Sequence, residues 1–428
     1  MTKVTLGTIG CASALALIAL AALARQPAAG ATTSAQQGAR WWKGNTHTHT
    51  LWSDGDDFPE MVADWYKRNG YHFLSITDHN TVANEERWWP VSPAGLGREA
   101  YDKYRARFGR LVEERQSGDT LTVRLRRQRE YAPQFNEPGR FLLVSGEEIT
   151  QYLERRGAHM NALNLIDVIP EQQGATLVEM LHRDLEAVRT QEQRTGREIT
   201  AVLNHPNFLW SQTAEDLLAL PALRFFEVYN GHPLVNLLGD SVHASTESLW
   251  DIVLTHRFAN DGGPLYGVAT DDSHDYHRFG PDQRNSGRGW IMVRTPRLEA
   301  DSLMAAMQRG DFYASTGVEL ADVRRDGARL SLAIREAPGV TYATQFIGTR
   351  RGWDTTSTPI RDSTGRAVTR RYSRDVGVVL AEVAGPSPSY VMRGDELYVR
   401  ARVVSTRRKA NGYLPNERET AWTQPVRP

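Results

Sequence analysis

Histidine and carboxylate side chains recur in short polar motifs between positions 47 and 274 of this 428-residue sequence. Most of these motifs follow short apolar runs that are typical of β-strands. In His47-Thr48-His49, the two imidazoles are two residues apart on a predicted strand, so they point to the same side and can both reach one metal ion. The other motifs are Ser53-Asp54-Gly55, Thr77-Asp78-His79, Gly146-Glu147-Glu148-Ile149, His159, Asn204-His205-Pro206 and Asp271-Asp272-Ser273-His274.

These residue types indicate that bound metal ions supply the chemistry. Nine imidazole or carboxylate ligands suffice for three divalent ions that keep positions open for water. Such ions lower the pKa of a water that they share, so that hydroxide is available near neutral pH. The lone cysteine, Cys11, lies in a segment that we expect to be removed, and we find no Gly-x-Ser-x-Gly motif, so we do not expect a covalent protein intermediate. The expected ligands are His47, His49, Asp54, His79, Glu148, His159, His205, Asp272 and His274.

The elements that must position these residues alternate between short apolar runs and helical stretches from Trp41 to about Thr316. This pattern is typical of β/α units around a parallel sheet, whose strands present their carboxyl ends at one face. A single histidine at a strand end is more often structural, but nine candidates at successive strand ends favour one shared site. The predicted strands are Lys43–Thr48, His72–Thr77, Phe141–Ser145, Asn161–Ile166, Thr200–Asn204, Phe225–Tyr229, Leu265–Ala269 and Trp290–Arg294, and the predicted helices include Pro59–Asn69, Leu177–Gln193, Ser245–Arg257 and Ala300–Arg309.

Three further segments complete the predicted organisation. Residues 1–31 have the layout of a secretory signal peptide, with Lys3 before an apolar run and small residues at its end; an uncleaved membrane anchor is the alternative. Residues 32–40 are predicted to be a linker, and 41–317 the catalytic domain. Within that domain, 88–139 is an arginine-rich insertion, which we interpret as a solvated helical segment rather than a lid for an anionic substrate. Residues 318–428 lack histidine and predict a small all-β, sandwich-like domain.

Taken together, the motifs resemble those of the PHP (polymerase and histidinol phosphatase) superfamily of metal-dependent hydrolases. The resemblance implies a distorted (β/α)7 barrel with two or three divalent ions, commonly zinc, manganese or iron. It also implies three ligand sets with Glu148 as a bridge, and Asp54 stands where many members of the family have a histidine. The implied sets are His47, His49, Glu148 and Asp272 for the first ion, Glu148, His159 and His205 for the second, and Asp54, His79 and His274 for the third.

Several other residues are candidates for supporting roles. We expect Asp78 and Asp271 to orient neighbouring imidazoles, because ligating histidines usually donate their other ring nitrogen to an acceptor. His232 and His277 lie on loops expected to face the site and are candidates for substrate contact. Arg284 and Arg288 are candidate contacts for an anion. The remaining histidines, His72, His182, His243 and His256, are expected to be structural or surface residues.

The leading functional hypothesis is a phosphoesterase that acts on small or nucleotide-like phosphate esters, supported by the resemblance. The second is hydrolysis of carboxyl esters or carbamates, because the N-terminus, the insertion and the C-terminal segment look like the exported, carbaryl-hydrolase-like branch of the superfamily. A third, of another class, is a non-catalytic carbohydrate or surface binding module that uses tryptophan pairs such as Trp41-Trp42. With 51 basic and 51 acidic residues, no stable nucleic-acid partner and no membrane contact beyond the signal peptide are expected. The expected location is the periplasm or the cell exterior.

Overall fold

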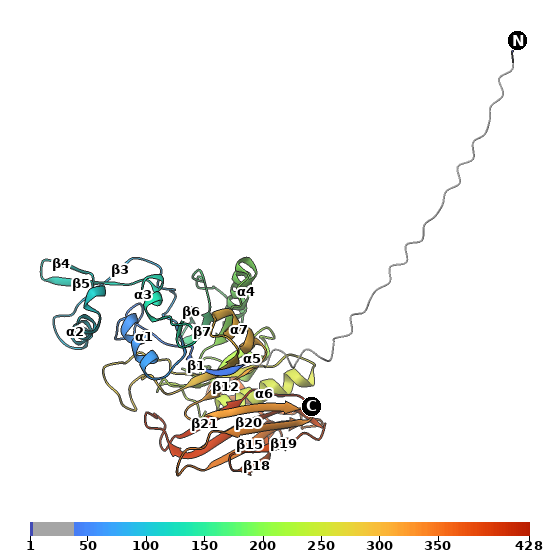
Figure 1. The fold of residues 1–428 in the computed structure, drawn as a ribbon. Helices are drawn as coiled ribbons and strands as arrows, with labels where there is room; N and C mark the ends of the chain where they lie inside the picture. Colours follow the sequence, from blue (N-terminus) through green and yellow to red (C-terminus); the bar gives the residue numbers. More distant parts are fainter. Residues whose placement is uncertain (3–37) are drawn as a thin grey trace. The chain divides into compact units, whose positions relative to one another are not determined.

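A mixed sheet of 13 strands runs through the computed structural model, which describes residues 1–2 and 38–428 (Figure 1). The predicted signal peptide and most of the predicted linker lie outside the described residues, and the last linker residue, Arg40, begins the first strand. Gly38–Pro428 belong to one compact unit. Among the described residues, no helix combines the length and the apolar character that crossing a membrane requires.

Seven strands carry or precede the sequence motifs. The pairs β1–β2, β2–β6, β8–β9 and β9–β10 are parallel, whereas β7 is antiparallel to both of its neighbours. A parallel bridge between Thr48 and Ser273 connects the chain just past β1 with the chain just past β10, and brings the first and last motifs side by side. These strands are β1 (Arg40–Asn45), β2 (Phe73–Ile76), β6 (Leu142–Leu153), β7 (Arg156–Leu163), β8 (Thr200–Leu203), β9 (Phe225–Asn230) and β10 (Tyr266–Thr270).

The hairpin of β6 and β7 is the main departure from the predicted β/α alternation. β6 continues to Leu153, eight residues past the predicted end at Ser145, and β7 begins at Arg156 rather than at Asn161. Two residues suffice to connect antiparallel strands, whereas a parallel partner would need a crossover of a dozen or more. The expectation that the glutamates follow a strand and that His159 precedes one is therefore wrong. Glu148 and His159 lie within paired strands, which fix their side chains more firmly than a loop would.

The four helices that the sequence predicts outside the insertion are present as α1, α4, α6 and α7, whereas α5 was not predicted. α4 begins at an N-cap, Thr176, whose hydroxyl accepts a hydrogen bond from the backbone N–H of Glu179, and it ends at Gly196, which adopts the left-handed conformation that stops many helices. Trp290–Thr295, however, forms a strand (β11) antiparallel to β1, so it is not a further parallel unit. The helices are α1 (Pro59–Arg68), α4 (Leu177–Thr195), α5 (Ala214–Leu218), α6 (Thr246–Ala259) and α7 (Ala300–Gln308).

The arginine-rich insertion folds into more than the predicted helices, because it also contains a three-stranded sheet. Its arginines are largely engaged: Arg124 pairs with Glu113 at 2.8 Å and with Glu130 at 3.0 Å, and Arg107 pairs with Asp64 of α1 at 2.9 Å. The insertion therefore neutralises much of its own charge. Its elements are β3 (Arg87–Pro90), α2 (Leu96–Phe108), η1 (Gly109–Leu111), β4 (Glu114–Ser117), β5 (Thr120–Leu125) and α3 (Gln128–Phe135).

Residues 318–428 contain only strands, as predicted, and several of these strands extend the same large sheet. β21 pairs with β12, which follows β11 in the sheet order, and a second sheet of β13, β14 and β19 shares an apolar core with it. The buried guanidinium of Arg400 pairs with Asp251 of α6 at 2.6 Å and ties this region to the helices. The strands are β12 (Phe312–Ser315), β13 (Leu320–Asp326), β14 (Arg329–Ile334), β15 (Tyr342–Arg350), β16 (Ser357–Arg361), β17 (Ala367–Tyr372), β18 (Val378–Ala384), β19 (Ser389–Val391), β20 (Glu396–Arg408) and β21 (Arg418–Thr423).

A buried acid on α4 makes the stability of this fold depend on pH. The side chain of Asp184 is fully buried and accepts one hydrogen bond, from Gln151 of β6 at 2.6 Å. Burial, reinforced by the carboxylate of Glu147, raises the pKa of Asp184 to about 8 from its ordinary value of 3.8. Folding therefore takes up a proton between these two pKa values, and stability falls as the pH rises through this window.

We predict that Asp184→Asn, which keeps the shape but removes the charge, removes the contribution of Asp184 to this fall. Its free energy of unfolding should exceed that of the wild type by a margin that grows from pH 5 to pH 8. Urea denaturation at pH 5, 6.5 and 8 measures this margin, and Glu186→Gln on the exposed face of α4 is the control. A margin that does not change with pH would contradict the prediction.

Candidate metal centre

The side chains of all nine predicted ligands lie in one connected cluster past the ends of β1, β2, β8 and β10 and on the β6–β7 hairpin. Eight of them fall into three overlapping groups, and within each group the donor atoms all lie within 4.8 Å of one another; the ninth, His159, lies 3.1 Å from Glu148. The groups are His47, His49 and Asp272; His47, Glu148 and His205; and His49, Asp54, His79 and His274. The structure thus brings together residues that are up to 227 positions apart in the sequence.

The first group has the spacing that a metal ion requires. The Nε2 atoms of His47 and His49 each lie 3.2 Å from Oδ1 of Asp272. They also lie 3.4 and 3.3 Å from Oε2 of Glu148. Two ligands that are each about 2.1 Å from a tetrahedral ion lie about 3.4 Å apart, so these four donors can share one ion. Both Nε2 atoms are buried and have no hydrogen-bond partner among the described residues, which a bound cation would explain.

Glu148 faces a second group of donors with its other oxygen. Oε1 of Glu148 lies 3.1 Å from Nδ1 of His159 and 3.5 Å from Nε2 of His205, and it accepts a hydrogen bond from Asn204 at 2.8 Å. Neither ring nitrogen of the buried His159 has a hydrogen-bond partner within residues 38–428. The two oxygens of Glu148 thus face different donor sets, and the arrangement fits a carboxylate that bridges two ions.

The third group contains the one solvent-exposed ligand candidate. Oδ1 of Asp54 lies 3.4 Å from Nε2 of His79 and 3.2 Å from Nε2 of His274. The side chain of Asp54 is 51% exposed, whereas those of His47 and Glu148 are at most 1% exposed. Water or a small molecule can therefore reach the cluster from the side of Asp54.

The cluster couples its titratable groups strongly. Burial disfavours the charged form of His47, but the carboxylates of Asp272 and Glu227 outweigh burial and raise its pKa well above the ordinary value. Burial, reinforced by His274, lowers the pKa of His49 to about 3. Burial would raise the pKa of Glu148, yet the surrounding imidazoles hold that pKa well below its ordinary value. Negative charge thus stays buried in the cluster, where divalent cations would balance it.

The imidazoles are oriented by groups other than those predicted. Nδ1 of His47 lies 2.7 Å from Oε1 of Glu227, and Nδ1 of His274 lies 2.9 Å from the backbone carbonyl of Asp272. Such contacts fix which ring nitrogen faces an ion.

The direct orienting role expected of Asp78 and Asp271 is wrong. Asp78 accepts hydrogen bonds from the backbone N–H and the hydroxyl of Thr50 and from the hydroxyl of Ser53, and reaches His49 only through Ser53, whose Oγ lies 3.3 Å from Nδ1 of His49. Asp271 accepts from the backbone N–H groups at positions 287–289 and from the hydroxyl of Tyr66. Both aspartates therefore hold loops of the site rather than imidazoles.

Glu227 is the main residue of the site that sequence reasoning missed. It is fully buried in β9, and its second oxygen accepts hydrogen bonds from the backbone N–H of His205 and from Asn230. The signal was present: Glu227 is the one charged residue of the predicted strand Phe225–Tyr229, and a charge in a buried strand needs a partner.

The two histidines predicted to contact substrate, His232 and His277, lie in different places relative to the site. The ring of His232 is buried 5.7 Å from that of His274, and burial lowers its pKa to about 4. His277 is buried between the carbonyl of Asp56 and the amine of Lys103, so it links the insertion to the site loop instead of facing the site.

The two arginines also differ. Arg284 is 32% exposed, is held by Asp275 at 2.8 Å, and has a guanidinium nitrogen 3.7 Å from Asp54, so it lies at the open side of the cluster. Arg288 is buried and donates to four backbone carbonyls. The expectation that Arg288 contacts an anion is therefore wrong.

Comparisons with known proteins give similar structures at low sequence identity. A two-domain protein from Bacteroides vulgatus, described as containing a predicted PHP-like metal-dependent phosphoesterase, is 14% identical; the match covers 92% of this chain and 97% of that one, with a TM-score of 0.39. A candidate metal-dependent phosphoesterase from Bifidobacterium adolescentis is 15% identical over 62% of this chain and 94% of that one, with a TM-score of 0.31. An amidohydrolase from Chromobacterium violaceum is 13% identical over 55% and 88%, with a TM-score of 0.27. No protein-family model and no curated protein matches the sequence.

Replacing Glu227 tests how the cluster is oriented. We predict that Glu227→Gln folds but binds Zn²⁺ about 10- to 100-fold more weakly, because the amide is a poorer acceptor for the N–H of His47. Competition with a chromophoric chelator measures this affinity. Glu417→Gln is the matched control, since Glu417 is also a largely buried carboxylate but bonds Tyr229 and Lys409 rather than an imidazole. Equal zinc affinity in Glu227→Gln and the wild type would contradict the assigned role.

Proposed function

We propose that this protein is a metal-dependent hydrolase of the PHP type that cleaves phosphate esters. The observation that carries the proposal is the cluster of nine imidazole and carboxylate side chains, with three overlapping donor groups and one side open to solvent at Asp54. Divalent ions bound there would activate water and polarise the ester. The ligand sets and the identity of the ions, zinc, manganese or iron, belong to the proposal.

The charges of the site favour an anionic substrate. The nine ligands include three carboxylates, so three divalent ions would leave the cluster positively charged, even when Glu227 is counted. Arg284 adds a guanidinium at the open side, where Asp275 holds its direction. A phosphate group would therefore meet positive charge on entry, and Arg284 would bind one of its oxygens.

The proposal extends to the fold of the catalytic region and to the location of the protein. With the bridge between Thr48 and Ser273, the seven strands that carry or precede the motifs form a ring at the level of the cluster, which we interpret as a distorted (β/α)7 barrel. We also propose that the protein is exported, on the basis of the apolar run after Lys3 and the small residues at 29–31.

A second candidate, hydrolysis of aryl carboxyl esters or carbamates, is favoured by apolar side chains beside the cluster. The ring of Tyr152 lies 5.0 Å from that of His159, and the ring of Phe208 lies 5.1 Å from that of His205. Tyr152 and Leu209 are each 53% exposed. These surfaces suit an aromatic leaving group, as the carbaryl-hydrolase-like branch would require.

The test compares ester classes and metal states. Protein stripped of metal and reloaded with Zn²⁺, Mn²⁺ or Fe²⁺ is assayed with p-nitrophenyl phosphate, bis-p-nitrophenyl phosphate, p-nitrophenyl acetate and 1-naphthyl methylcarbamate. We expect phosphate-ester turnover that needs metal and falls at least about 100-fold in Glu148→Gln. Glu198→Gln, an exposed residue before β8, is the control.

Each other outcome has a defined meaning. Turnover of the acetate or carbamate without turnover of either phosphate ester would replace the leading proposal with the second candidate. Turnover that is equal without metal would overturn both. If no ester is cleaved and His47→Ala/His49→Ala still binds carbohydrate as the wild type does, the protein is a binding module.

A further inference from the structure

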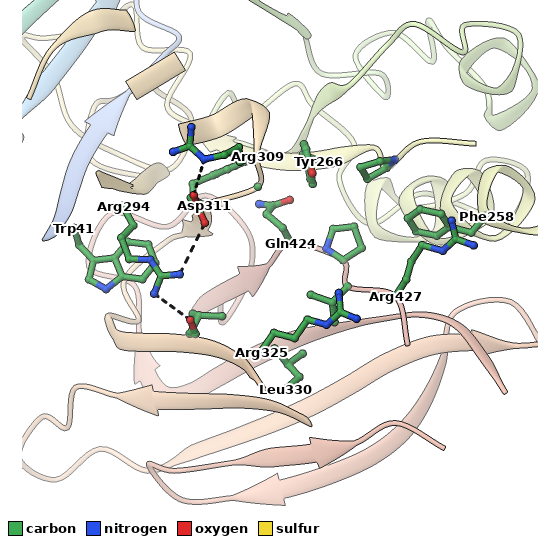
Figure 2. Close-up of a pocket in the computed structure, with 16 residues that line it drawn as sticks. Trp41, Phe258, Tyr266, Arg294, Arg309, Asp311, Arg325, Leu330, Gln424 and Arg427 are labelled. Carbon is green, nitrogen blue, oxygen red and sulfur yellow. Dashed lines mark hydrogen bonds and ion pairs between the residues drawn. The ribbon is translucent and has the colours of Figure 1, made fainter. Parts of the chain in front are cut away.

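A cavity, shown in Figure 2, lies at the starts of β1 and β10, opposite the strand ends that precede the metal cluster. Its lining includes Trp41 near the start of β1 and Tyr266 at the start of β10, whereas His47 and Asp272 lie just past the ends of these two strands. Six residues of extended chain span about 20 Å, so the cavity is well separated from the cluster. Its volume of about 420 Å³ is in the range of small-molecule sites.

The lining of this cavity is rich in arginine. Arg294, Arg309, Arg325 and Arg427 line it, with Asp311 as the single carboxylate. The lining has no histidine or cysteine, which excludes a metal site of the kind described above. The excess of positive charge favours an anionic ligand.

Two of the four arginines are already paired. Arg309 pairs with Asp311 at 3.1 Å, and Arg294 pairs with Asp322 at 3.0 Å and lies 3.9 Å from Asp311. Figure 2 shows the contacts of Asp311 with Arg309 and Arg294 as dashed lines on one side of the cavity. The positive charges on this side are therefore largely balanced by carboxylates of the protein itself.

The other two arginines retain unused donors. Among the described residues, Arg325 donates only to the carbonyl of Gly327, at 3.3 Å, and it has no carboxylate within 4.0 Å. Arg427 lies 3.7 Å from Asp261, but that aspartate is 94% exposed, and an exposed pair of this length contributes little. A guanidinium has five N–H donors, so both groups can bind a carboxylate or phosphate.

The walls between these charges are apolar and rigid. Phe258, Tyr266, Phe312 and Leu330 line the cavity and are themselves buried, so their positions are fixed by packing. The guanidinium of Arg427 lies 5.1 Å from the ring of Phe258, which directs it along the cavity wall. A ligand that fills this space needs an apolar body as well as an anionic head.

We infer that this cavity is a second binding site, for a small organic anion with an apolar or aromatic body and a carboxylate or phosphate-type head that Arg325 and Arg427 bind. The site is remote from the metal cluster, and its ligand is not the substrate of the hydrolase. The inference does not depend on which ester the cluster cleaves.

Isothermal titration calorimetry of the metal-loaded protein at low ionic strength tests this site. The probes are 4-phenylbutyrate and phenylphosphonate, with neutral 4-phenylbutanol as the comparison. We expect saturable binding of one or both organic anions, with 4-phenylbutanol at least tenfold weaker. Binding should weaken at least about tenfold in Arg325→Gln and in Arg427→Gln, because each loses a charge-assisted hydrogen bond.

Arg329→Gln is the matched control, since Arg329 lies on β14 outside the lining and bonds Ser389. Its affinity for the anions should equal that of the wild type. The inference is overturned if neither organic anion binds, if the neutral alcohol binds equally well, or if both cavity variants bind like the wild type. Anions that bind at the metal cluster would give this last result, so the two sites are distinguished.

Discussion

The structure depends on one constraint: carboxylate and imidazole side chains are packed together in a region from which water is largely excluded. Glu148 and Asp272 are buried, and each contacts several histidines. Burying such charges is costly unless cations or hydrogen bonds compensate them. Hydrogen bonds satisfy some of these groups: Asn204 bonds Glu148, Glu227 bonds His47, and the backbone carbonyl of Asp272 bonds His274. The nitrogens that remain without partners mark the places where metal ions would complete the balance.

This constraint explains the unusual arrangement of strands near the site. A parallel sheet alone would place every ligand just past a strand end, but Glu148 and His159 lie on the two antiparallel strands of the β6–β7 hairpin, 3.1 Å apart. The hairpin puts a carboxylate among the imidazoles, where it contacts His159 of β7 and histidines just past the ends of β1, β2 and β8. Asp78 and Asp271 then fix the loops that border the open side of the cluster, at Asp54. The opposite end of the sheet contains the arginine-lined cavity, so the two ends differ in the charged residues that they present.

Much of this arrangement could be predicted from local patterns. The positions of most strands, the helices α1, α4, α6 and α7 and the convergence of all nine candidate ligands follow from apolar periodicity and from strand-end motifs. The direction of β7, the sheet in the insertion and the pairing of β21 with β12 could not be predicted, because they depend on contacts between distant segments. Glu227 and Arg288 show the same limit for single residues: both are buried charges whose roles are set by partners far away in the sequence.

Anomalous X-ray diffraction from crystals of protein purified without chelator and soaked in Mn²⁺ or Zn²⁺ tests the central claim most directly. The account predicts at least two anomalous peaks within the cluster, one between His47, His49 and Asp272 and another beside Asp54, His79 and His274. Metal-to-ligand distances should be about 2.0–2.3 Å. Crystals with these side chains placed as described, but with no anomalous peak among them, would contradict it.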